Sequence, residues 1–435
     1  MESKIFYTAG RKAVNNIRQN LYRPINTYYK DYCSYPEELQ LLGSEDKSAL
    51  LQNISHMPEK EIILYIHLPF CSSLCVFCNM KKCGMPDKEI VKKYFSCLEK
   101  EIEMYSKNLG ISNKIVRAVY LGGGTPSSVS SDVLYKLIDS INEKFILSED
   151  VEFTIEVHPR DILRKSKTDF LKTIKSKGIN RISIGIQSLD NKVLKINNRG
   201  HTAGDAKQAC SIIKDNGFIL SADMMFGLPG QFPDSVRQDL KKLENIEKDT
   251  VEYFRTEFCT EKLVRLFKAK PKLFADDDSV FKMNELVFEW LLNKGYEQQG
   301  TIKENNKFYR YRYLTLKQFP VIGLGICAQS QTSRTSYQNC FNINSYCKII
   351  SSNRLPITKG RVLTKEEIGI RKIFISLQLK SGLDVKKYKQ EYGKFPELIN
   401  KFKELKVVEE KDGFLRLTKI GSFFTSDICS QILKI

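Results

Sequence analysis

Tyr65-Ile-His-Leu-Pro-Phe-Cys71-Ser-Ser-Leu-Cys75-Val-Phe-Cys78 is the stretch that says most about the fold and chemistry of this 435-residue chain. Its three cysteines have the spacing C-x3-C-x2-C and follow an apolar run that is typical of a buried strand. Three thiolates at this spacing indicate an iron–sulfur site. A [4Fe–4S] cluster held by only three cysteines leaves one iron without a protein ligand, and that iron can bind a substrate.

A zinc site completed by Cys83 is the alternative interpretation of these cysteines. Structural zinc sites usually draw on two separated pairs of ligands, whereas this triplet has no second pair near it. The sequence therefore favours the cluster and predicts a free thiol at Cys83. The remaining cysteines are scattered singly, which is expected of a chain in a reducing compartment; they are Cys33, Cys97, Cys210, Cys259, Cys327, Cys340, Cys347 and Cys429.

Composition predicts a soluble, cytoplasmic protein with a full core. The apolar share is 42%, no run of eighteen apolar residues occurs, and the first residues lack the apolar stretch of a secretory signal. The net charge of +18 comes from lysines that are interleaved with acids, as in residues 241–248. That pattern favours solvated helix faces over a nucleic-acid site. A basic cleft for an anionic, carboxylate-bearing small molecule is a weaker alternative.

From about residue 59 the sequence alternates between short apolar runs and amphipathic segments. The predicted strands are Glu61–His67, Ile115–Leu121, Val151–Val157, Arg181–Ile186, Phe218–Phe226 and Val251–Glu257. The predicted helices are Lys88–Ser106, Ser131–Lys144, Asp161–Ser176, Thr202–Asn216 and Pro233–Glu247, with Gly178 and Gly217 as helix stops. A further helix is expected at Asp278–Lys294, and Val321–Gln329 is expected to form a strand or turn that approaches the site.

Six strands separated by five helices predict an α/β fold, a partial (β/α)6 barrel of parallel strands. The expected domains are an N-terminal helical arm over residues 1–58, the barrel over 59–262, an extension closing the barrel over 263–360, and a small C-terminal domain over 361–435. The last of these resembles a winged helix, with a hairpin at Val407–Leu417 and a final helix at Ile420–Leu433. We expect this domain to pack or cap rather than to bind DNA.

Five unusual features follow the ends of successive predicted strands. Because the carboxyl ends of parallel strands gather at one rim, these features predict a ligand site there. The glycines among them would let a ligand approach the backbone closely. In chain order the features are the cysteine loop, Gly122-Gly123-Gly124-Thr125, Glu156, Gln187 and Asp223.

Together these residues resemble the radical S-adenosylmethionine superfamily and, within it, the oxygen-independent coproporphyrinogen III oxidase family. The resemblance is dense from about residue 60 to 260. The stretches that carry it are Tyr65-Ile-His-Leu-Pro-Phe-Cys71, Gly122-Gly-Gly-Thr-Pro126, Ile155-Glu-Val-His-Pro159, Ile184-Gly-Ile-Gln-Ser-Leu-Asp190 and Asp223-Met-Met-Phe-Gly-Leu-Pro-Gly-Gln231.

The resemblance implies a [4Fe–4S] cluster on Cys71, Cys75 and Cys78 that reductively cleaves S-adenosylmethionine to a 5′-deoxyadenosyl radical, with a reducing partner such as flavodoxin or ferredoxin. It also implies one or two bound S-adenosylmethionine molecules. Tyr65, Gly122 and Glu156 match residues that hold the cluster-bound molecule. The positions that match residues around a second molecule are Phe77, Gly123, Gly124, Thr125, Gln187, Arg199 and Asp223.

Simpler structural roles remain open for some of these side chains. Phe77 is also explained as a core residue, Glu156 as a strand-end carboxylate in a salt bridge, and Arg199 as a solvated side chain. His67 is explained equally well as a satisfied core histidine and as a site residue.

The sequence departs from the family in ways that bear on the reaction. The oxidases typically carry a fourth cysteine where this chain has Met80, and the related haem chaperones carry histidines in the second half, where this chain has none after His201. A cofactor-contacting position near Gln329 is also altered. These departures favour a third branch, radical methyltransferases acting on a bulky small molecule such as a tetrapyrrole. Porphyrinogen oxidation and non-catalytic haem carriage are the alternatives.

Overall fold

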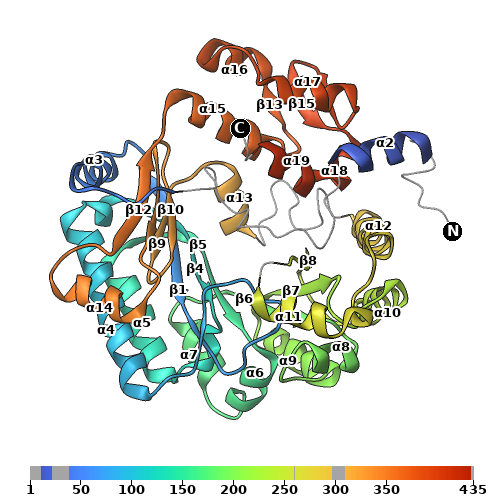
Figure 1. Ribbon diagram of the computed structural model, residues 1–435. Helices are drawn as coiled ribbons and strands as arrows, with labels where there is room; N and C mark the ends of the chain where they lie inside the picture. The colour runs from blue at the N-terminus through green and yellow to red at the C-terminus, as the bar shows by residue number, and fades with distance from the viewer. Residues whose placement is uncertain (1–10, 22–38, 259, 296–308, 433–435) are drawn as a thin grey trace.

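The computed structural model describes residues 11–21, 39–258, 260–295 and 309–432 (Figure 1). Most of these residues belong to one unit built around a ten-stranded sheet, whose order is β12-β11-β10-β9-β1-β4-β5-β6-β7-β8. The run from β1 to β8 is entirely parallel, which confirms the predicted α/β class. Its strands are β1 (Glu61–Leu68), β4 (Ile115–Gly123), β5 (Ile146–Val157), β6 (Arg181–Gln187), β7 (Ile219–Phe226) and β8 (Thr250–Arg255).

Helices connect these parallel strands and bury their apolar faces against the sheet, as Figure 1 shows around its lower half. Gly178 and Gly217 have positive φ angles, +101° and +72°, just after helices end, as the sequence predicts. The connecting helices are α4 (Lys88–Asn108), α5 (Ser131–Lys144), α6 (Pro159–Lys165), α7 (Phe170–Ser176), α8 (Asn191–Ile196), α9 (Ala203–Asp215) and α10 (Pro233–Glu244).

The single helix predicted over Asp161–Ser176 is wrong, because the chain forms α6 and α7 with a break between them. In the break the Thr168 hydroxyl donates to the Lys165 carbonyl at 2.7 Å and accepts from the Phe170 amide at 3.3 Å. A short hydroxyl side chain that bonds its own backbone competes with helix continuation. The apolar periodicity runs through the break and conceals it.

The chain after residue 309 extends the sheet on the side of β1. Strand β9 (Val321–Leu324) pairs in parallel with β1, and three antiparallel strands follow, β10 (Gln329–Gln331), β11 (Thr335–Asn339) and β12 (Ile357–Val362). Helix α14 (Ile343–Ser351) lies beside α4, and α3 (Ser44–Ser55) lies against β12 (Figure 1). The edge strands of this sheet are β8 and β12, and in Figure 1 the curved sheet leaves a gap between them.

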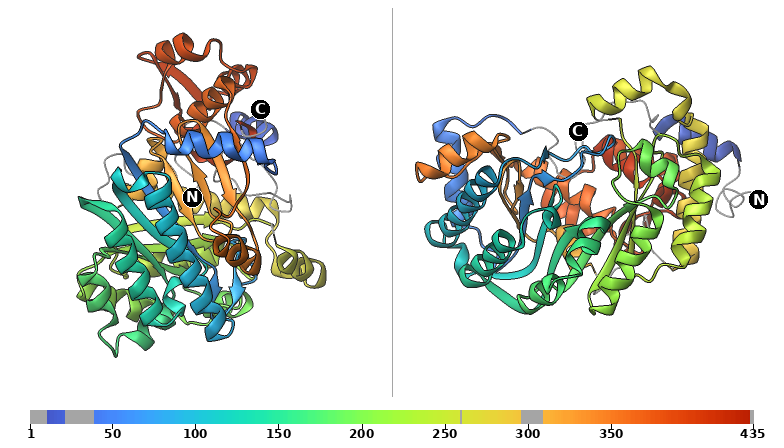
Figure 2. Two further views of the ribbon diagram at one scale, coloured as in Figure 1. Left: turned by 90° about the vertical axis from the view of Figure 1, so that its left-hand side faces the viewer. Right: turned by 90° about the horizontal axis from the view of Figure 1, so that it is seen from below.

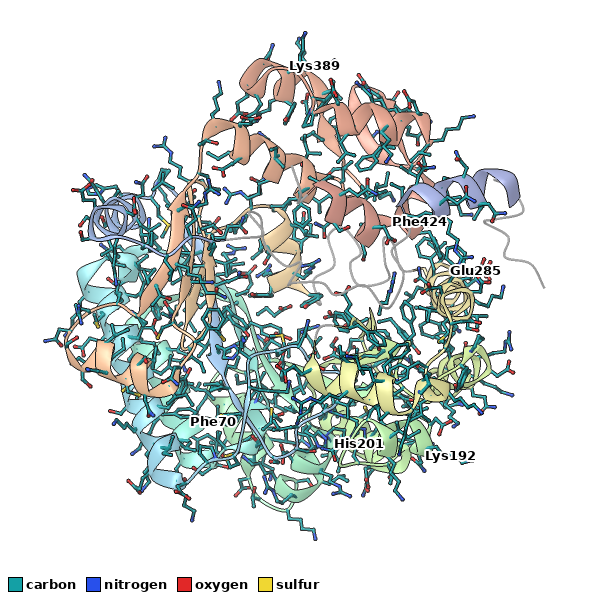
Figure 3. All side chains as sticks on the ribbon, viewed as in Figure 1. Phe70, Lys192, His201, Glu285, Lys389 and Phe424 are labelled. Atoms are coloured by element: carbon teal, nitrogen blue, oxygen red, sulfur yellow. The ribbon has the colours of Figure 1, made fainter. Side chains whose placement is uncertain are left out.

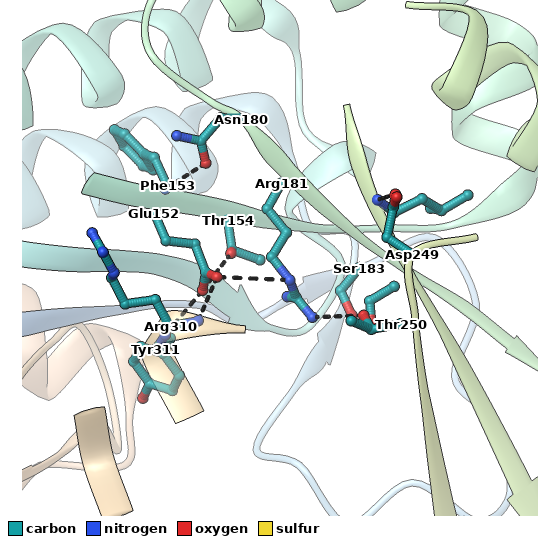
Figure 4. A network of polar contacts seen from close by, with 12 residues as sticks. Glu152, Phe153, Thr154, Asn180, Arg181, Ser183, Asp249, Thr250, Arg310 and Tyr311 are labelled. Carbon is teal, nitrogen blue, oxygen red and sulfur yellow. Dashed lines mark hydrogen bonds and ion pairs between the residues drawn. The ribbon is translucent and has the colours of Figure 1, made fainter. Parts of the chain in front are cut away.

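A buried polar network seals the amino ends of the parallel strands, and we call it the floor (Figure 4). Arg181 is fully buried, with Nε 4.0 Å from Glu152 and Nη2 3.8 Å from Glu252. The Glu152 carboxylate also accepts the backbone N–H groups of Arg310 and Tyr311 at 2.6 and 3.0 Å. It therefore caps α13 (Arg310–Leu316) and fixes that helix beneath β1 and β4.

A second, smaller core joins the C-terminal residues to two distant helices. Helices α2 (Arg11–Leu21) and α12 (Asp277–Asn293) pack there, as Figures 1 and 2 show for α2. Helix α11 (Glu261–Ala269) leads from β8 to α12. The C-terminal elements are α15 (Lys365–Ser376), β13 (Leu383–Asp384), α16 (Val385–Tyr392), α17 (Glu397–Glu404), β14 (Val408–Lys411), β15 (Phe414–Leu417), α18 (Lys419–Phe423) and α19 (Thr425–Ile432).

The final helix predicted over Ile420–Leu433 is likewise divided, and Leu433 lies outside the described residues. Its break falls at Phe424, which is completely buried against Phe281 and Phe423. The winged-helix resemblance and the domain boundaries remain predictions. Within the described ranges, none of the helices is both long and apolar enough to cross a membrane.

Candidate functional site

Polar side chains line one face of the parallel strands, because the strand register carries the same alternation from strand to strand. Tyr65 pairs with Tyr120, Glu156 with Ser183, and Gly185 with Asp223. In a parallel sheet, paired residues point to the same side. Tyr65, Glu156 and Asp223 are partly exposed, although their neighbours along each strand are buried. The carboxyl halves of the strands thus present an accessible polar surface, which we call the rim.

The cysteine loop begins at the same end of the sheet. Cys71 closes the short strand β2 (Phe70–Cys71), which pairs in parallel with β3 (Cys83–Gly84). The Thr125 hydroxyl donates to the Cys71 sulfur at 3.5 Å, and Arg199 donates to the Cys75 sulfur at 3.3 Å. Burial raises the pKa of the Cys71 thiol to about 11, and the Thr125 hydrogen bond opposes this shift. Cys75 and Cys78 are partly exposed, and all three sulfurs are free thiols.

This donor set suits a cluster better than a single ion. Within the described part of the chain, no three His, Cys, Asp or Glu side chains converge so as to hold one metal ion. A structural zinc requires such convergence at about 2.3 Å. The thiolates around a [4Fe–4S] cube bind different irons, so their sulfurs stand apart. Three loop thiols, backed by a hydroxyl and a guanidinium, therefore fit the cluster, whereas the zinc alternative with Cys83 loses support.

The glycine triplet has a structural cause that the sequence did not reveal. A Cβ on Gly123, whose φ is +107°, would lie 2.4 Å from the His67 ring. A Cβ on Gly122 would lie 2.9 Å from the Glu156 carboxyl, and one on Gly124 would lie 2.6 Å from the Pro69 backbone. Real Cβ atoms do not approach other atoms this closely, so the protein's own packing requires glycine at positions 123 and 124, whereas at 122 the Glu156 side chain would have to shift.

The amides around the triplet are also used within the protein. Gly123 donates to Glu156 at 3.0 Å, Gly124 to the Leu68 carbonyl at 2.8 Å and Thr125 to the Phe70 carbonyl at 2.8 Å. A ligand that hydrogen-bonds to this turn would therefore have to donate to the carbonyl groups of the turn. The amides of Gly123, Gly124 and Thr125 already donate within the protein.

Glu156 is held in place by its neighbours on the rim. The Tyr120 hydroxyl donates to Oε1 at 2.9 Å, and the Gly123 amide donates to Oε2 at 3.0 Å. Burial raises the pKa of Glu156 to about 7, although both hydrogen bonds favour the carboxylate. Among the described residues, Glu156 bonds the Tyr120 hydroxyl and the Gly123 amide, and no salt bridge to it is found there.

Asp223 has a comparable setting two strands away. The Ser183 hydroxyl lies 2.8 and 2.9 Å from its two oxygens, so that it donates to the carboxylate. Burial, and then the negative charge of Glu252, raise the pKa of Asp223 well above its usual range. An acid of this kind can donate as well as accept a hydrogen bond.

Arg199 and Gln187 lie at the carboxyl end of β6. Gln187 has a positive φ of +71°, a conformation that is uncommon outside glycine. A Cβ on Gly185 would lie 2.9 Å from the Gln187 amide and 3.2 Å from the Arg199 guanidinium, which places these two side chains together. Arg199 donates to both the Gly185 carbonyl and Cys75 and is partly exposed. It therefore links the cysteine loop to β6, and its interpretation as a solvated side chain is wrong.

Phe77 is mainly a packing residue. Only 8% of it is exposed, and it forms a small apolar cluster with Val193 and Leu228. Cys75, Cys78 and Met225 lie against the same cluster. The ring thus shapes the wall beside two of the three thiols.

His67 contributes a hydrogen-bonded chain that sequence reasoning left undecided. Its Nε2 lies 2.7 Å from the Lys81 carbonyl, and its Nδ1 lies 3.0 Å from the Tyr65 hydroxyl. Burial lowers the pKa of His67 to about 4, so the ring is neutral at pH 7. Because a carbonyl only accepts, Nε2 carries the proton and Nδ1 accepts from Tyr65. His67 thereby fixes the Tyr65 hydroxyl and the loop at Lys81.

Tyr120 and Ser183 were missed at the sequence level, although they orient Glu156 and Asp223. A signal for both existed in the two-residue alternation of polar groups along runs expected to be buried on both faces, as in Glu152, Thr154 and Glu156. The segment Val321–Gln329 was expected to approach the site, and it brings the Cys327 sulfur to 3.5 Å from His67 Nε2. No local pattern links residues 67 and 327.

Comparisons with known proteins agree with this geometry. Residues 65–243 match the model of the radical SAM superfamily. The oxygen-independent coproporphyrinogen III oxidase of Salmonella typhimurium is 25% identical over 410 residues, covering 90% of this chain and 88% of the relative. The heme chaperone HemW of Bacillus subtilis is also 25% identical, over 381 residues, covering 85% of this chain and 98% of the chaperone.

A solved structure shares the fold. The structure described as coproporphyrinogen III oxidase (HemN) from Escherichia coli, a radical SAM enzyme, superposes with a TM-score of 0.80 at 22% identity. The match covers 93% of this chain and 96% of that one. The likeness therefore includes the sheet extension and the C-terminal elements as well as the parallel strands.

Proposed function

We propose a reaction for this chain from one premise: it is a radical SAM enzyme related to the oxygen-independent coproporphyrinogen III oxidases. Enzymes of this superfamily use a [4Fe–4S] cluster and S-adenosylmethionine. When bound, this pair supplies a one-electron cleavage that produces a radical able to remove hydrogen from an unactivated carbon. The observation that carries the proposal is the set of three loop thiols, two of which accept hydrogen bonds from Thr125 and Arg199.

Cys71, Cys75 and Cys78 would hold the cluster. Thr125 orients Cys71 by hydrogen bonding, and Arg199 brings positive charge to Cys75. A cluster with thiolate ligands is anionic, and a nearby guanidinium stabilises negative charge. The Phe77 cluster excludes water from the side of Cys75 and Cys78.

Glu156, Tyr65 and Asp223 are suited to a ligand that carries both an ammonium group and hydroxyls. Glu156 has a carboxylate fixed by two donors, so its remaining lone pairs point at a fixed place. A bound cation would also lower its raised pKa and hold it ionised. Tyr65 is oriented by His67, and Asp223 by Ser183. These residues fit one or two S-adenosylmethionine molecules, with Gln187 and Arg199 at the second.

The substrate proposed is a carboxylate-bearing tetrapyrrole. Both relatives described above handle tetrapyrroles by name, and the chain's net charge of +18 suits an anionic ligand. We place hydrogen abstraction from such a molecule first. Methyl transfer, which the departures from the family favour, has no support from the relatives named above. Met80, 43% exposed where the oxidases have a cysteine, keeps haem carriage as the second candidate.

Iron content tests the ligand assignment. After anaerobic reconstitution we expect about four irons per chain. Cys71→Ala should lose the cluster, whereas the matched control Cys83→Ala, altered on the paired strand, should retain it. Equal iron in the two variants would contradict the assignment, and stoichiometric zinc would restore the alternative.

Product analysis tests the reaction. The reconstituted protein is incubated anaerobically with dithionite, methyl-labelled S-adenosylmethionine, and either coproporphyrinogen or haem. Formation of 5′-deoxyadenosine coupled to loss of hydrogen from the tetrapyrrole supports the proposal. Label in the tetrapyrrole would instead establish methyl transfer. Stoichiometric haem binding without coupled 5′-deoxyadenosine would establish the carrier.

A further inference from the structure

We propose that the protein surface over the cysteine loop is the docking site for a small acidic protein that delivers one electron at a time. The proposal rests on the proposed function, because only a redox cluster at the loop requires such a donor. We call this surface the loop face, and it is formed by Met80, Lys81, Lys82, Met85, Phe341 and Lys359.

The first argument is position. Strand β3 pairs directly with β2, with Gly84 opposite Cys71, and the Cys83 amide donates to the Pro69 carbonyl at 2.8 Å. The Lys82 ammonium in turn reaches the Cys78 carbonyl at 2.5 Å. A single layer of backbone therefore separates the loop face from two of the proposed ligands. The rate of electron transfer falls steeply with distance, so an electron donor must bind where little protein separates it from the proposed cluster ligands.

The second argument is shape and apolar exposure. A hollow of about 240 Å³ lies between the loop and the beginning of α14, lined in part by Lys81, Cys83, Ile326 and Phe341. Around it, Met80, Met85 and Phe341 are 43%, 40% and 40% exposed. Large apolar side chains with such exposure are uncommon on this protein, and protein interfaces are enriched in Met and aromatic residues. Methionine side chains are also flexible, which suits a surface that binds its partner transiently.

The third argument is charge. Lys81 and Lys359 place their ammonium groups 5.2 and 5.6 Å from the centre of the Phe341 ring, so the apolar centre has a cationic border. Residues 80–93 contain five lysines and only two acids. Such a border attracts an acidic partner and steers its approach. A second copy of this chain, also at +18, would be repelled.

These three features together select the occupant. An acidic carrier with a flavin or an iron–sulfur cluster, of the flavodoxin or ferredoxin kind, meets the charge, the apolar centre and the need for a nearby redox group. The carrier gives up one electron and the cluster site takes it up, with no bond formed or broken in the transfer itself. Nucleic acid would meet the charge but would leave the exposed Met and Phe side chains without a partner.

Binding is tested first, since it does not depend on turnover. An acidic flavodoxin is titrated into the anaerobically reconstituted protein at low salt, and Kd is read from flavin anisotropy. We expect Lys81→Glu/Lys359→Glu to weaken Kd about tenfold or more and 0.5 M salt to weaken the wild-type complex similarly. The control Lys386→Glu/Lys389→Glu has the same charge change on exposed positions of α16, and Figure 3 places Lys389 far from Phe70. It should stay within about twofold of wild type.

Lys389 makes the control a close one. It is exposed and lies 5.8 Å from the Phe395 ring, so it repeats the lysine–phenylalanine arrangement of the loop face on the C-terminal helices. A third variant, Phe341→Ser, keeps the charge and removes the apolar centre. It should also weaken Kd, by about fivefold.

Electron delivery separates this proposal from the proposed function. With dithionite, which needs no docking, all variants should cleave S-adenosylmethionine at the wild-type rate. With reduced flavodoxin, only the loop-face variants should be slow. No cleavage by wild type with dithionite would overturn the proposed function. Two results would overturn the docking site alone, provided that the rates with dithionite are normal. The first is an unchanged flavodoxin Kd in both Lys81→Glu/Lys359→Glu and Phe341→Ser. The second is an equal loss of affinity in the control variant.

Discussion

The floor and the rim of the parallel strands use the same kinds of side chain for different purposes. Glu152 and Glu156 lie four residues apart on one strand and face the same side of the sheet. Glu152 is 4% exposed and meets Arg181 and the capped end of α13, whereas Glu156 is partly exposed and meets only a phenol and one amide. Residue type therefore does not distinguish structural from functional carboxylates here. The number of protein partners does.

The largest expected effect on stability is at the floor. Arg181→Met should lower the free energy of unfolding by about 3–5 kcal/mol, because Glu152 and Glu252 would be left buried without their shared cation. The control Arg164→Met breaks an ion pair whose arginine side chain is 63% exposed, and should cost less than about 1 kcal/mol. Chemical unfolding followed by circular dichroism measures both. Equal small losses would mean that the floor does not depend on its central charge.

Gly123→Ala tests whether the glycines of the rim serve the protein or the ligand. The new Cβ would meet the His67 ring at 2.4 Å, so we expect a loss of about 2–3 kcal/mol even in ligand-free protein.

Gly110→Ala is the matched control. Gly110 also has a positive φ, +64° in the left-handed region, but nothing lies within 4 Å of its Cβ position, so only backbone strain remains, about 1 kcal/mol. If the two variants unfold at the same denaturant concentration, packing against His67 is not the reason for Gly123.

The smallest effect concerns pH and Glu156. Its pKa in the folded protein is raised from 4.5 to about 7, so between these values the folded protein holds a proton that the unfolded chain has released. This contribution to stability is complete below about pH 4.5 and is lost as the pH rises through 7. Because the side chain is partly exposed, we expect a loss of only about 1–2 kcal/mol.

Glu156→Gln isolates that contribution, because the amide cannot titrate. In ligand-free protein the difference in unfolding free energy between wild type and Glu156→Gln should change by this amount from pH 4.5 to 8. Glu152→Gln, at the floor, is the comparison on the same strand. A difference between wild type and Glu156→Gln that does not vary with pH would show that folding does not raise the pKa of Glu156.

The positions of the parallel strands along the chain were predictable, because a strand that is buried on both faces is a short, nearly continuous apolar run in the sequence. Five of the six predicted strands both start and end within two residues of those observed, and only β5 begins well before its predicted start, at Ile146. The helix breaks at residues 166–169 and at Phe424 were not predictable, since they depend on side-chain hydrogen bonds and packing that apolar periodicity does not record. The packing of α2 on the C-terminal core was missed for the same reason.

The candidate site divides in the same way. The cysteines, Glu156, Gln187 and Asp223 could be placed at one rim because parallel strands carry their carboxyl ends to the same edge. Their supporting residues could not, because Tyr120 and Ser183 act across neighbouring strands and His67 bonds the distant loop carbonyl of Lys81.

The sequence by itself determined the α/β class, the strands that build the sheet and the spacing of the three cysteines in the loop. These properties depend on residue type and spacing, which are local and directly readable. Only the tertiary structure decided that the glycine triplet accommodates His67 and Glu156, that Arg181 belongs to the floor, and that Lys81 and Phe341 share the surface over the cysteine loop. Each of these depends on which distant residues meet, and that is fixed by packing and by the neutralisation of buried charge rather than by any pattern along the chain.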